Sequence, residues 1–180
     1  EPVSIKTIEC AIIDKGFEEG WIKPQKIDNK TGKKVAIIGA GPAGLACSQQ
    51  LIRAGHEVTV YEKNNKAGGL LRYGIPDFKM EKTVIDRRIE QIEGEGVVFS
   101  YDTTIGKDIS MEELKNKYDA IVLSGGSEYP RDLPVEGRDL DGIHFAMDFL
   151  PQQNRRVSYE KIPNNTKEIL ASDKNVIVIG

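Results

Sequence analysis

The sequence contains little cysteine, and its two cysteines, Cys10 and Cys47, lie far apart. A disulfide framework needs several cysteines, and a zinc or iron-sulfur site needs ligands at characteristic short spacings. Neither can be built from these two residues alone. Scarce, unpaired cysteine is typical of a reducing compartment, so we expect a cytoplasmic protein.

Long hydrophobic runs and charge of one sign are also missing. No apolar run approaches the roughly 20 residues that span a bilayer. The formal net charge of the 180 residues is -3, which gives no strong electrostatic reason to bind nucleic acid or an anionic membrane. With 39% hydrophobic and 29% charged residues, the composition is that of an ordinary globular protein. We therefore expect neither nucleic acid nor a membrane as a partner.

The chain lacks an initial methionine, and its first residues, EPVSIKTIEC, do not have the pattern of a signal peptide. We interpret the sequence as part of a longer protein. Its length suffices for one buried core and part of a second, because domains usually have about 100 to 150 residues.

Alternating strand and helix patterns occupy most of the chain. Apolar residues recur at helical spacing over residues 4–19, with Ser4 as the expected N-cap, and residues 23–32 have the Pro, Asn and Gly content of a connector. The pattern beyond the connector predicts strands at 34–38, 57–61, 97–101 and 119–123, and helices at 42–54, 81–93 and 111–117. Such alternation predicts an α/β fold with a largely parallel sheet and right-handed crossovers.

Three segments follow from these patterns. Residues 1–30 form an N-terminal helical segment and linker, residues 31–150 a Rossmann-like domain, and residues 151–180 a mobile connector followed by a strand of a second domain. The polar run PQQNRRVSYEKIPNNTKE has little periodicity and predicts a loop. The final NVIVIG echoes KVAIIG at 34–39 and predicts a second nucleotide-binding strand, although any buried strand has a similar composition.

Gly39, Gly41 and Gly44 form a GxGxxG motif between a predicted strand and a predicted helix. This is the context in which the motif binds dinucleotides. The first glycine permits a tight turn, the second lets a pyrophosphate approach the backbone, and the third lets the helix pack closely on the sheet. Pro42 suits the first helical position, where no N–H is needed. Amide groups and the helix dipole would then face the phosphates.

Glu62 ends the second predicted strand and follows Gly44 at close to the offset of about 20 residues expected for a carboxylate that binds ribose hydroxyls. The alternative is a solvated glutamate at a strand end. A 2′-phosphate about 4 Å from this carboxylate would be repelled by about 4 kcal/mol at a surface-like dielectric. NADP is therefore disfavoured here, and NAD and FAD remain. The pair Gly68–Gly69, shortly after Glu62, favours FAD.

Two cations follow the glycine pair. Arg72 and Lys79 suit an anionic phosphate or flavin, or else are solvated surface charges. His56 and His144 have no nucleophile or second ligand beside them, so we interpret both as structural. We predict no metal site in the chain.

The run from Gly39 to Gly69 resembles the FAD-binding fingerprint of flavoproteins with two dinucleotide-binding domains. The stretches GGLLRYGIPDFKMEK and PRDLPVEGRDLDGIHFAMDFL resemble the NAD(P)H-oxidising small (beta) subunit, or reductase region, of glutamate synthase. The opening residues are similar to the same family just downstream of its iron-sulfur cysteines. The resemblance covers nearly the whole chain and implies a three-layer, glutathione-reductase-like FAD domain that is incomplete here and ends where a second Rossmann domain begins.

The resemblance also implies contacts with FAD at matching positions. The turn from Gly39 to Gly44, with Pro42 and Ala43, would hold the pyrophosphate. Further contacts are implied for Glu62 and Lys63 at the adenosine ribose, for Gly69, Leu70 and Arg72 along the cofactor, for Ile75 and Pro76 near the flavin, for Lys79 as a basic contact, for Ile105 at the adenine, and for Ser124 and Gly125 at a strand end. At Ser124–Gly126 the sequence departs from the Ala-Thr-Gly motif usual in relatives.

The function that the resemblance implies is an NAD(P)H-dependent flavoprotein oxidoreductase. A hydride would pass to FAD, and electrons would then leave through iron-sulfur clusters toward glutamate synthesis on the large subunit or region. The flavin would carry the chemistry, so no catalytic acid, base or nucleophile is expected in this chain. A homo-oligomer is compatible with this function. The alternatives are a related reductase with a pyrimidine or ferredoxin as acceptor, an NAD-dependent dehydrogenase, and a non-catalytic nucleotide-binding module. We expect the 180 residues alone to have no NAD(P)H oxidase activity and to bind FAD weakly.

Overall fold

A parallel four-stranded sheet is the centre of the computed structural model, which describes residues 3–164 and 166–179. The strand order is β3–β2–β1–β4, with bounds β1 (Lys34–Ile38), β2 (Glu57–Tyr61), β3 (Val98–Ser100) and β4 (Ala120–Leu123). β1 lies between β2 and β4, so that Ile38 aligns with both Tyr61 and Leu123. The parallel arrangement brings the carboxyl ends of the strands to one edge, and the predicted α/β fold is confirmed.

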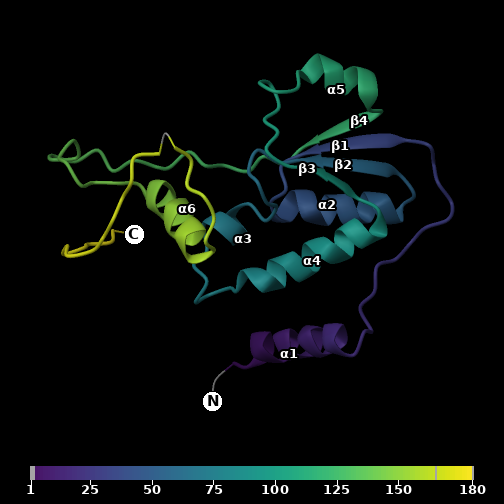
Figure 1. Ribbon diagram of the computed structural model, residues 1–180, viewed down its shortest axis with the longest axis horizontal. Helices are drawn as coiled ribbons and strands as arrows, with labels where there is room; N and C mark the ends of the chain where they lie inside the picture. The colour runs from purple at the N-terminus through teal and green to yellow at the C-terminus, as the bar shows by residue number, and fades with distance from the viewer. Residues whose placement is uncertain (1–2, 165, 180) are drawn as a thin grey trace.

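Helices cover both faces of the sheet, as Figure 1 shows. On one face lie α2 (Pro42–Arg53) and α4 (Lys82–Glu95), and on the other α5 (Met111–Lys117). Beyond α4 lies α1 (Ile5–Glu18), and near the carboxyl edge of the sheet lie α3 (Leu70–Tyr73) and α6 (Ala146–Val157). Every predicted strand and helix up to residue 123 is present with its ends within two residues of the prediction; α3 was not predicted.

Alternating side chains of the strands fill two separate cores. Ile37 and Val60 point to one face and are fully buried with Ile52 of α2 and Ile92 of α4. On the other face a smaller cluster contains Ala36, Tyr61 and Leu114 of α5. Burial of each large aliphatic side chain contributes about 2 kcal/mol. The larger core fixes α2 against β1, which sets the position of the glycine turn between them.

Two details of the N-terminal helix differ from the prediction. Ser4 precedes α1, but its side chain makes no capping hydrogen bond. The apolar residues Ile5, Ile8 and Ile12 are 54–64% exposed, so the described residues leave this side of the helix uncovered. α1 instead contacts α4 through Arg87. The Arg87 guanidinium donates to Asp14 at 2.8 Å and lies 4.1 Å from the centre of the Phe17 ring.

The predicted loop from Pro151 is wrong as far as Val157, because α6 continues through Pro151 to that residue. Proline removes one helical hydrogen bond, but two buried side-chain amides donate hydrogen bonds that hold this part of the helix in place. Gln152 donates to the carbonyl of Lys167 at 3.1 Å, and Asn154 donates to the carbonyl of Tyr73 at 2.9 Å. These anchors are polar, so hydrophobic periodicity does not reveal this part of the helix.

The predicted strand near the end of the chain is not formed over the described residues 175–179. The side chains of Val176, Ile177, Val178 and Ile179 are 62–87% exposed. A strand requires a neighbouring strand for its hydrogen bonds, and the described part of the chain provides none to these residues. Gly180 lies outside the described residues. Within residues 3–164 and 166–179, no helix combines the length and the apolar character needed to cross a bilayer.

A buried carboxylate links α2 and α4. Glu95 accepts two hydrogen bonds from Arg53, at 2.8 and 2.6 Å, and one from Gln49 at 3.0 Å. Burial by itself raises the pKa of Glu95, but the hydrogen bonds and charge of Arg53, together with hydrogen bonds from Gln25 and Gln49, outweigh burial and hold the pKa below its ordinary value. The ionised form therefore stabilises the fold.

We expect Glu95→Gln to lower the free energy of unfolding by about 2 kcal/mol, somewhat less than the cost of breaking a fully buried pair, since Arg53 is 26% exposed. Because the folded-state pKa lies below the unfolded value of about 4.3, this contribution is complete above that value and disappears as the pH falls through the folded pKa. Urea unfolding at pH 7 and pH 3 measures it.

The matched control is Glu90→Gln, at an exposed position on the same helix. It should change stability by less than about 0.5 kcal/mol at both pH values. Equal effects of the two substitutions at pH 7 would contradict the role of Glu95.

Candidate functional site

The turn between β1 and α2 is tightly packed at its first glycine. The amide of Gly39 donates to the carbonyl of Tyr61 at 2.8 Å, and its φ of +104° lies in the region that favours glycine. A Cβ at Gly39 would lie 2.5 Å from the carbonyl oxygen of Ser124, at the end of β4. The Ser124 hydroxyl in turn donates to the carbonyls of Ile38 and Gly39, at 3.0 and 3.1 Å. The fold itself therefore requires this glycine.

The second and third glycines have different surroundings. A Cβ at Gly44 would lie 2.0 Å from the carbonyl oxygen of Gly39, so Gly44 lets α2 pack directly on the turn. A Cβ at Gly41 would have no atom within 4 Å, and the φ and ψ of Gly41, −75° and −179°, are accessible to other residues. Nothing in the described protein requires glycine at position 41. The open space beside its backbone is available to a ligand.

Gly41 is also the N-cap of α2, and Pro42 occupies the first helical position. The first amide groups of any α-helix have no acceptor within the helix, and the helix dipole makes this end positive. Open space, amide donors and positive potential are therefore combined at the carboxyl edge of the sheet. Together they suit a phosphate group.

The carboxylate of Glu62 faces this turn. Glu62 follows β2 and is 5% exposed. Its Oε2 accepts from the amide of Ala40 at 2.9 Å, and its Oε1 accepts from the backbone and side-chain nitrogens of Asn64, at 2.9 and 2.8 Å. A carboxylate offers about four acceptor positions, so one position remains on Oε2, next to the turn. The alternative of a solvated strand-end glutamate is wrong.

The glycine pair folds back onto the same turn. The amide of Gly68 donates to the carbonyl of Ala40 at 2.9 Å, and a Cβ at Gly69 would lie 2.9 Å from Cα of Gly41. Both glycines have positive φ, +128° and +52°. The loop from Glu62 to Gly69 thus closes one side of the open space beside Gly41.

Arg72 is not a solvated surface charge. It is 2% exposed, its Nε donates to the carbonyl of Ala67 at 2.6 Å, and its guanidinium pairs with Asp86 of α4. Lys79, by contrast, is exposed, with its ammonium 5.9 Å from the centre of the Phe78 ring. Arg72 braces the end of the loop from Glu62 to Gly69, whereas Lys79 lies on the surface beyond α3.

The remaining predicted residues lie at several places around the turn. Lys63 forms an exposed ion pair with Glu128 at 2.5 Å. Leu70 is 47% exposed at the start of α3, and Ile75 and Pro76, just after that helix, are partly buried. A Cβ at Gly125 would have no atom within 4 Å, whereas Ile105 packs in the small core beneath α5.

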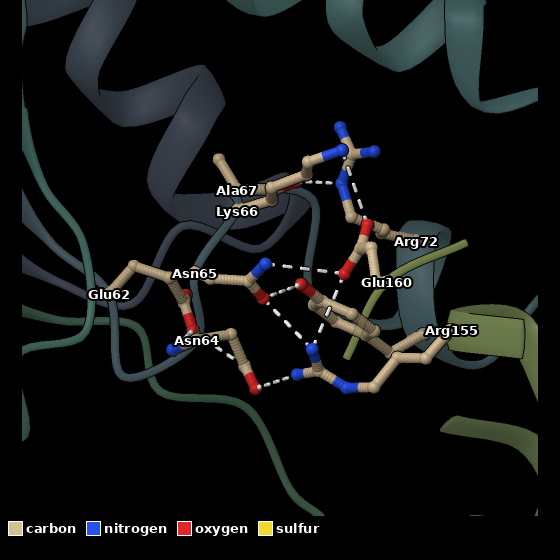
Figure 2. Close-up of polar contacts among 9 residues, drawn as sticks. Glu62, Asn64, Asn65, Lys66, Ala67, Arg72, Arg155 and Glu160 are labelled. Carbon is tan, nitrogen blue, oxygen red and sulfur yellow. Dashed lines mark hydrogen bonds and ion pairs between the residues drawn. The ribbon is translucent and has the colours of Figure 1, made fainter. Parts of the chain in front are cut away.

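Side chains that follow Glu62 form a polar network with the end of α6, shown in Figure 2. Asn64 and Asn65 accept hydrogen bonds from Arg155, and Asn65 also accepts one from Tyr73. Burial raises the pKa of Tyr73 to about 12, so its hydroxyl remains a donor at neutral pH. This network was not predicted, because Arg155 lies 90 and 91 positions from Asn65 and Asn64 and shares no motif with them.

The sequence is similar to that of known proteins. The profile of the pyridine nucleotide-disulphide oxidoreductase family matches residues 33–180. The chain is 50% identical to the glutamate synthase [NADPH] small chain of Mycobacterium tuberculosis (strain ATCC 25618 / H37Rv) and 52% identical to that of Bacillus subtilis, over 100% and 99% of its own length. It is also 50% identical to the glutamate synthase [NADH] of Schizosaccharomyces pombe, over 99% of its length.

The chain spans about a third of the two bacterial relatives, 37% and 36% of their length, and 8% of the yeast one. Among solved structures, it is similar to Mycobacterium tuberculosis FprA in complex with NADPH, with a TM-score of 0.62 and 27% identity. That match covers 68% of this chain and 29% of FprA.

Proposed function

The chain belongs to the pyridine nucleotide-disulphide oxidoreductase family, and from this premise we propose that its glycine turn binds the adenosine diphosphate half of FAD. The observation that carries the proposal is the open backbone at Gly41 with the Glu62 carboxylate held beside it through the amide of Ala40. Amides at the start of α2 would donate to the pyrophosphate, and Oε2 of Glu62 would accept from a ribose hydroxyl.

The donors and acceptors of the turn fit this ligand. Gly41 leaves room for a pyrophosphate, and a negative carboxylate beside the ribose would repel a 2′-phosphate. Around this centre we propose that Gly39, Pro42, Ala43, Gly44 and Gly69 shape the pocket and that Arg72 holds its loop through Ala67. Further contacts with the cofactor are proposed for Lys63, Leu70, Ile75, Pro76, Lys79, Ile105, Ser124 and Gly125.

For the whole protein we propose an NAD(P)H-dependent oxidoreductase of the glutamate synthase type, working with a glutamate synthase large subunit or region. The names of the relatives support this assignment, and relatives of similar identity are named for NADPH and for NADH, so the proposal is for NAD(P)H as a class. When bound, FAD would supply the hydride-accepting chemistry. The described residues of this chain contain no set of cysteine ligands for an iron-sulfur cluster. We therefore propose iron-sulfur clusters only for the whole protein, and for this chain only the binding of FAD.

We further propose that residues 1–30 form an N-terminal helical segment and linker, residues 31–150 an incomplete FAD-binding domain and residues 151–180 the connection to the nicotinamide domain. The end of α6 would then lie in the connection and still contact the FAD-binding domain, because Arg155 donates to Asn64 and Asn65 in the loop that follows Glu62.

The proposal is tested with the whole protein by measuring the FAD dissociation constant of Glu62→Gln. We expect at least about a tenfold loss of affinity, since a hydrogen bond to a charged acceptor contributes about 1.5–3 kcal/mol. The matched control is Glu57→Gln, which replaces an exposed glutamate at the start of β2 and should bind FAD like the wild type. A Glu62→Gln protein with unchanged FAD affinity would contradict the proposal.

A further inference from the structure

Arg155, near the end of α6, forms hydrogen bonds with the loop that follows Glu62. Its side chain is 11% exposed, and its guanidinium lies 4.5 Å from the centre of the Tyr73 ring. Two of its nitrogens donate separately, Nη1 to the side-chain oxygen of Asn65 at 2.9 Å and Nη2 to that of Asn64 at 3.1 Å. Figure 2 shows the guanidinium of Arg155 reaching both asparagines.

The contact with Asn64 continues to the candidate ribose acceptor. The same Asn64 amide donates through Nδ2 to Oε1 of Glu62 at 2.8 Å. A cation at the oxygen of an amide polarises its NH₂ group and strengthens the bond that this group donates. It also fixes the orientation of the amide, because the oxygen must face the guanidinium and the NH₂ group the carboxylate. Arg155, Asn64 and Glu62 thus form one hydrogen-bonded relay.

The charge of Arg155 is already balanced on its other side. Glu160, whose side chain is 7% exposed, lies 3.3 Å from Nη1 of Arg155 and 3.2 Å from the ammonium of Lys66. The guanidinium is therefore held between Glu160 and the two asparagines and is not positioned to bind a phosphate. Its position suits the support of Glu62 rather than direct contact with a ligand.

We propose that Arg155 is a positioning residue for the adenosine ribose: through Asn64 it sets the direction of the Glu62 carboxylate and leaves the open acceptor position of Oε2 toward the turn. This inference rests on the proposed function, because it assigns Glu62 to the ribose. Lysine cannot replace the arginine fully, because a single ammonium does not have the planar fork that reaches two amides at once.

The test is a double-mutant cycle on the whole protein, with the FAD dissociation constant as the readout for the wild type, Arg155→Gln, Glu62→Gln and the double variant. We expect Arg155→Gln to weaken FAD about tenfold in the wild-type background and to have almost no effect when Glu62 is already replaced, because residues in one hydrogen-bond network are not additive. Arg155→Lys should lie between the wild type and Arg155→Gln.

The matched control is Arg156→Gln, at the adjacent position, whose guanidinium contacts Gln152, Gln153 and Glu168 instead of the loop. It should leave FAD affinity unchanged. Additive effects of Arg155→Gln and Glu62→Gln, or wild-type affinity of Arg155→Gln, would overturn the positioning role while the FAD site stands. Wild-type affinity of Glu62→Gln would overturn both. If circular dichroism shows that Arg155→Gln does not fold, the cycle with Arg155→Lys gives the same decision.

Discussion

Gly41→Ala is expected to fold like the wild type and to lose FAD binding by about 100-fold, which corresponds to about 2.8 kcal/mol and to the upper range of overpacking costs. The added methyl group meets no protein atom within 4 Å, and the backbone angles at this position are accessible to alanine. It would instead occupy the space through which a pyrophosphate approaches the backbone. The substitution is therefore expected to lower the affinity for FAD and to leave the free energy of unfolding unchanged.

The measurement is fluorescence titration of the flavin-free whole protein with FAD, combined with urea unfolding of the same protein in the absence of FAD. Equal unfolding midpoints for Gly41→Ala and the wild type are needed for the comparison. If Gly41→Ala binds FAD as tightly as the wild type, the open space beside Gly41 is not the pyrophosphate position.

Gly44→Ala, three positions further along, is expected to act on the fold. Its Cβ would lie 2.0 Å from the carbonyl oxygen of Gly39, and a backbone oxygen cannot turn aside as a flexible side chain can. α2 must shift from the turn, which we expect to lower the free energy of unfolding by about 3 kcal/mol. Urea unfolding in the absence of FAD measures this effect directly.

The two glycines thus separate the roles that the GxGxxG spacing combines. Unchanged unfolding of Gly44→Ala would contradict the close packing of α2 on the turn. Both variants introduce alanine into the same turn. If one loses FAD affinity and the other loses stability, general damage to the motif does not explain the effects.

The sheet and its covering helices were predictable because burial imposes a period on the sequence. β1 and β2 carry alternating or continuous apolar residues such as Ile37 and Val60, and the buried side of α4 repeats Ile85, Ile89 and Ile92 at helical spacing. The glycine turn was predictable for a second reason, since Gly39 and Gly44 are required by steric contacts that recur wherever a strand meets a helix in this way.

The polar side of the candidate site could not be predicted in the same way. Arg72 was predicted to be either a ligand contact or a solvated surface charge, and the second alternative is wrong, because Arg72 is buried between Ala67 and Asp86. The relay from Arg155 to Glu62 joins Arg155 to Asn64, which lies 91 positions earlier in the chain. Hydrogen-bond partners at such separations leave no periodic signal, and the same lack of signal hid the last turns of α6, which are held by Gln152 and Asn154.

We propose that the turn at Gly41 and the carboxylate of Glu62 together hold the adenosine diphosphate half of FAD. The most direct measurement is a crystal structure of the whole protein with FAD bound. We expect pyrophosphate oxygens within hydrogen-bond distance of the amides at the start of α2 and a ribose hydroxyl on Oε2 of Glu62. A structure in which the adenosine diphosphate half lies elsewhere, with Glu62 bonded only to Ala40 and Asn64, would contradict it.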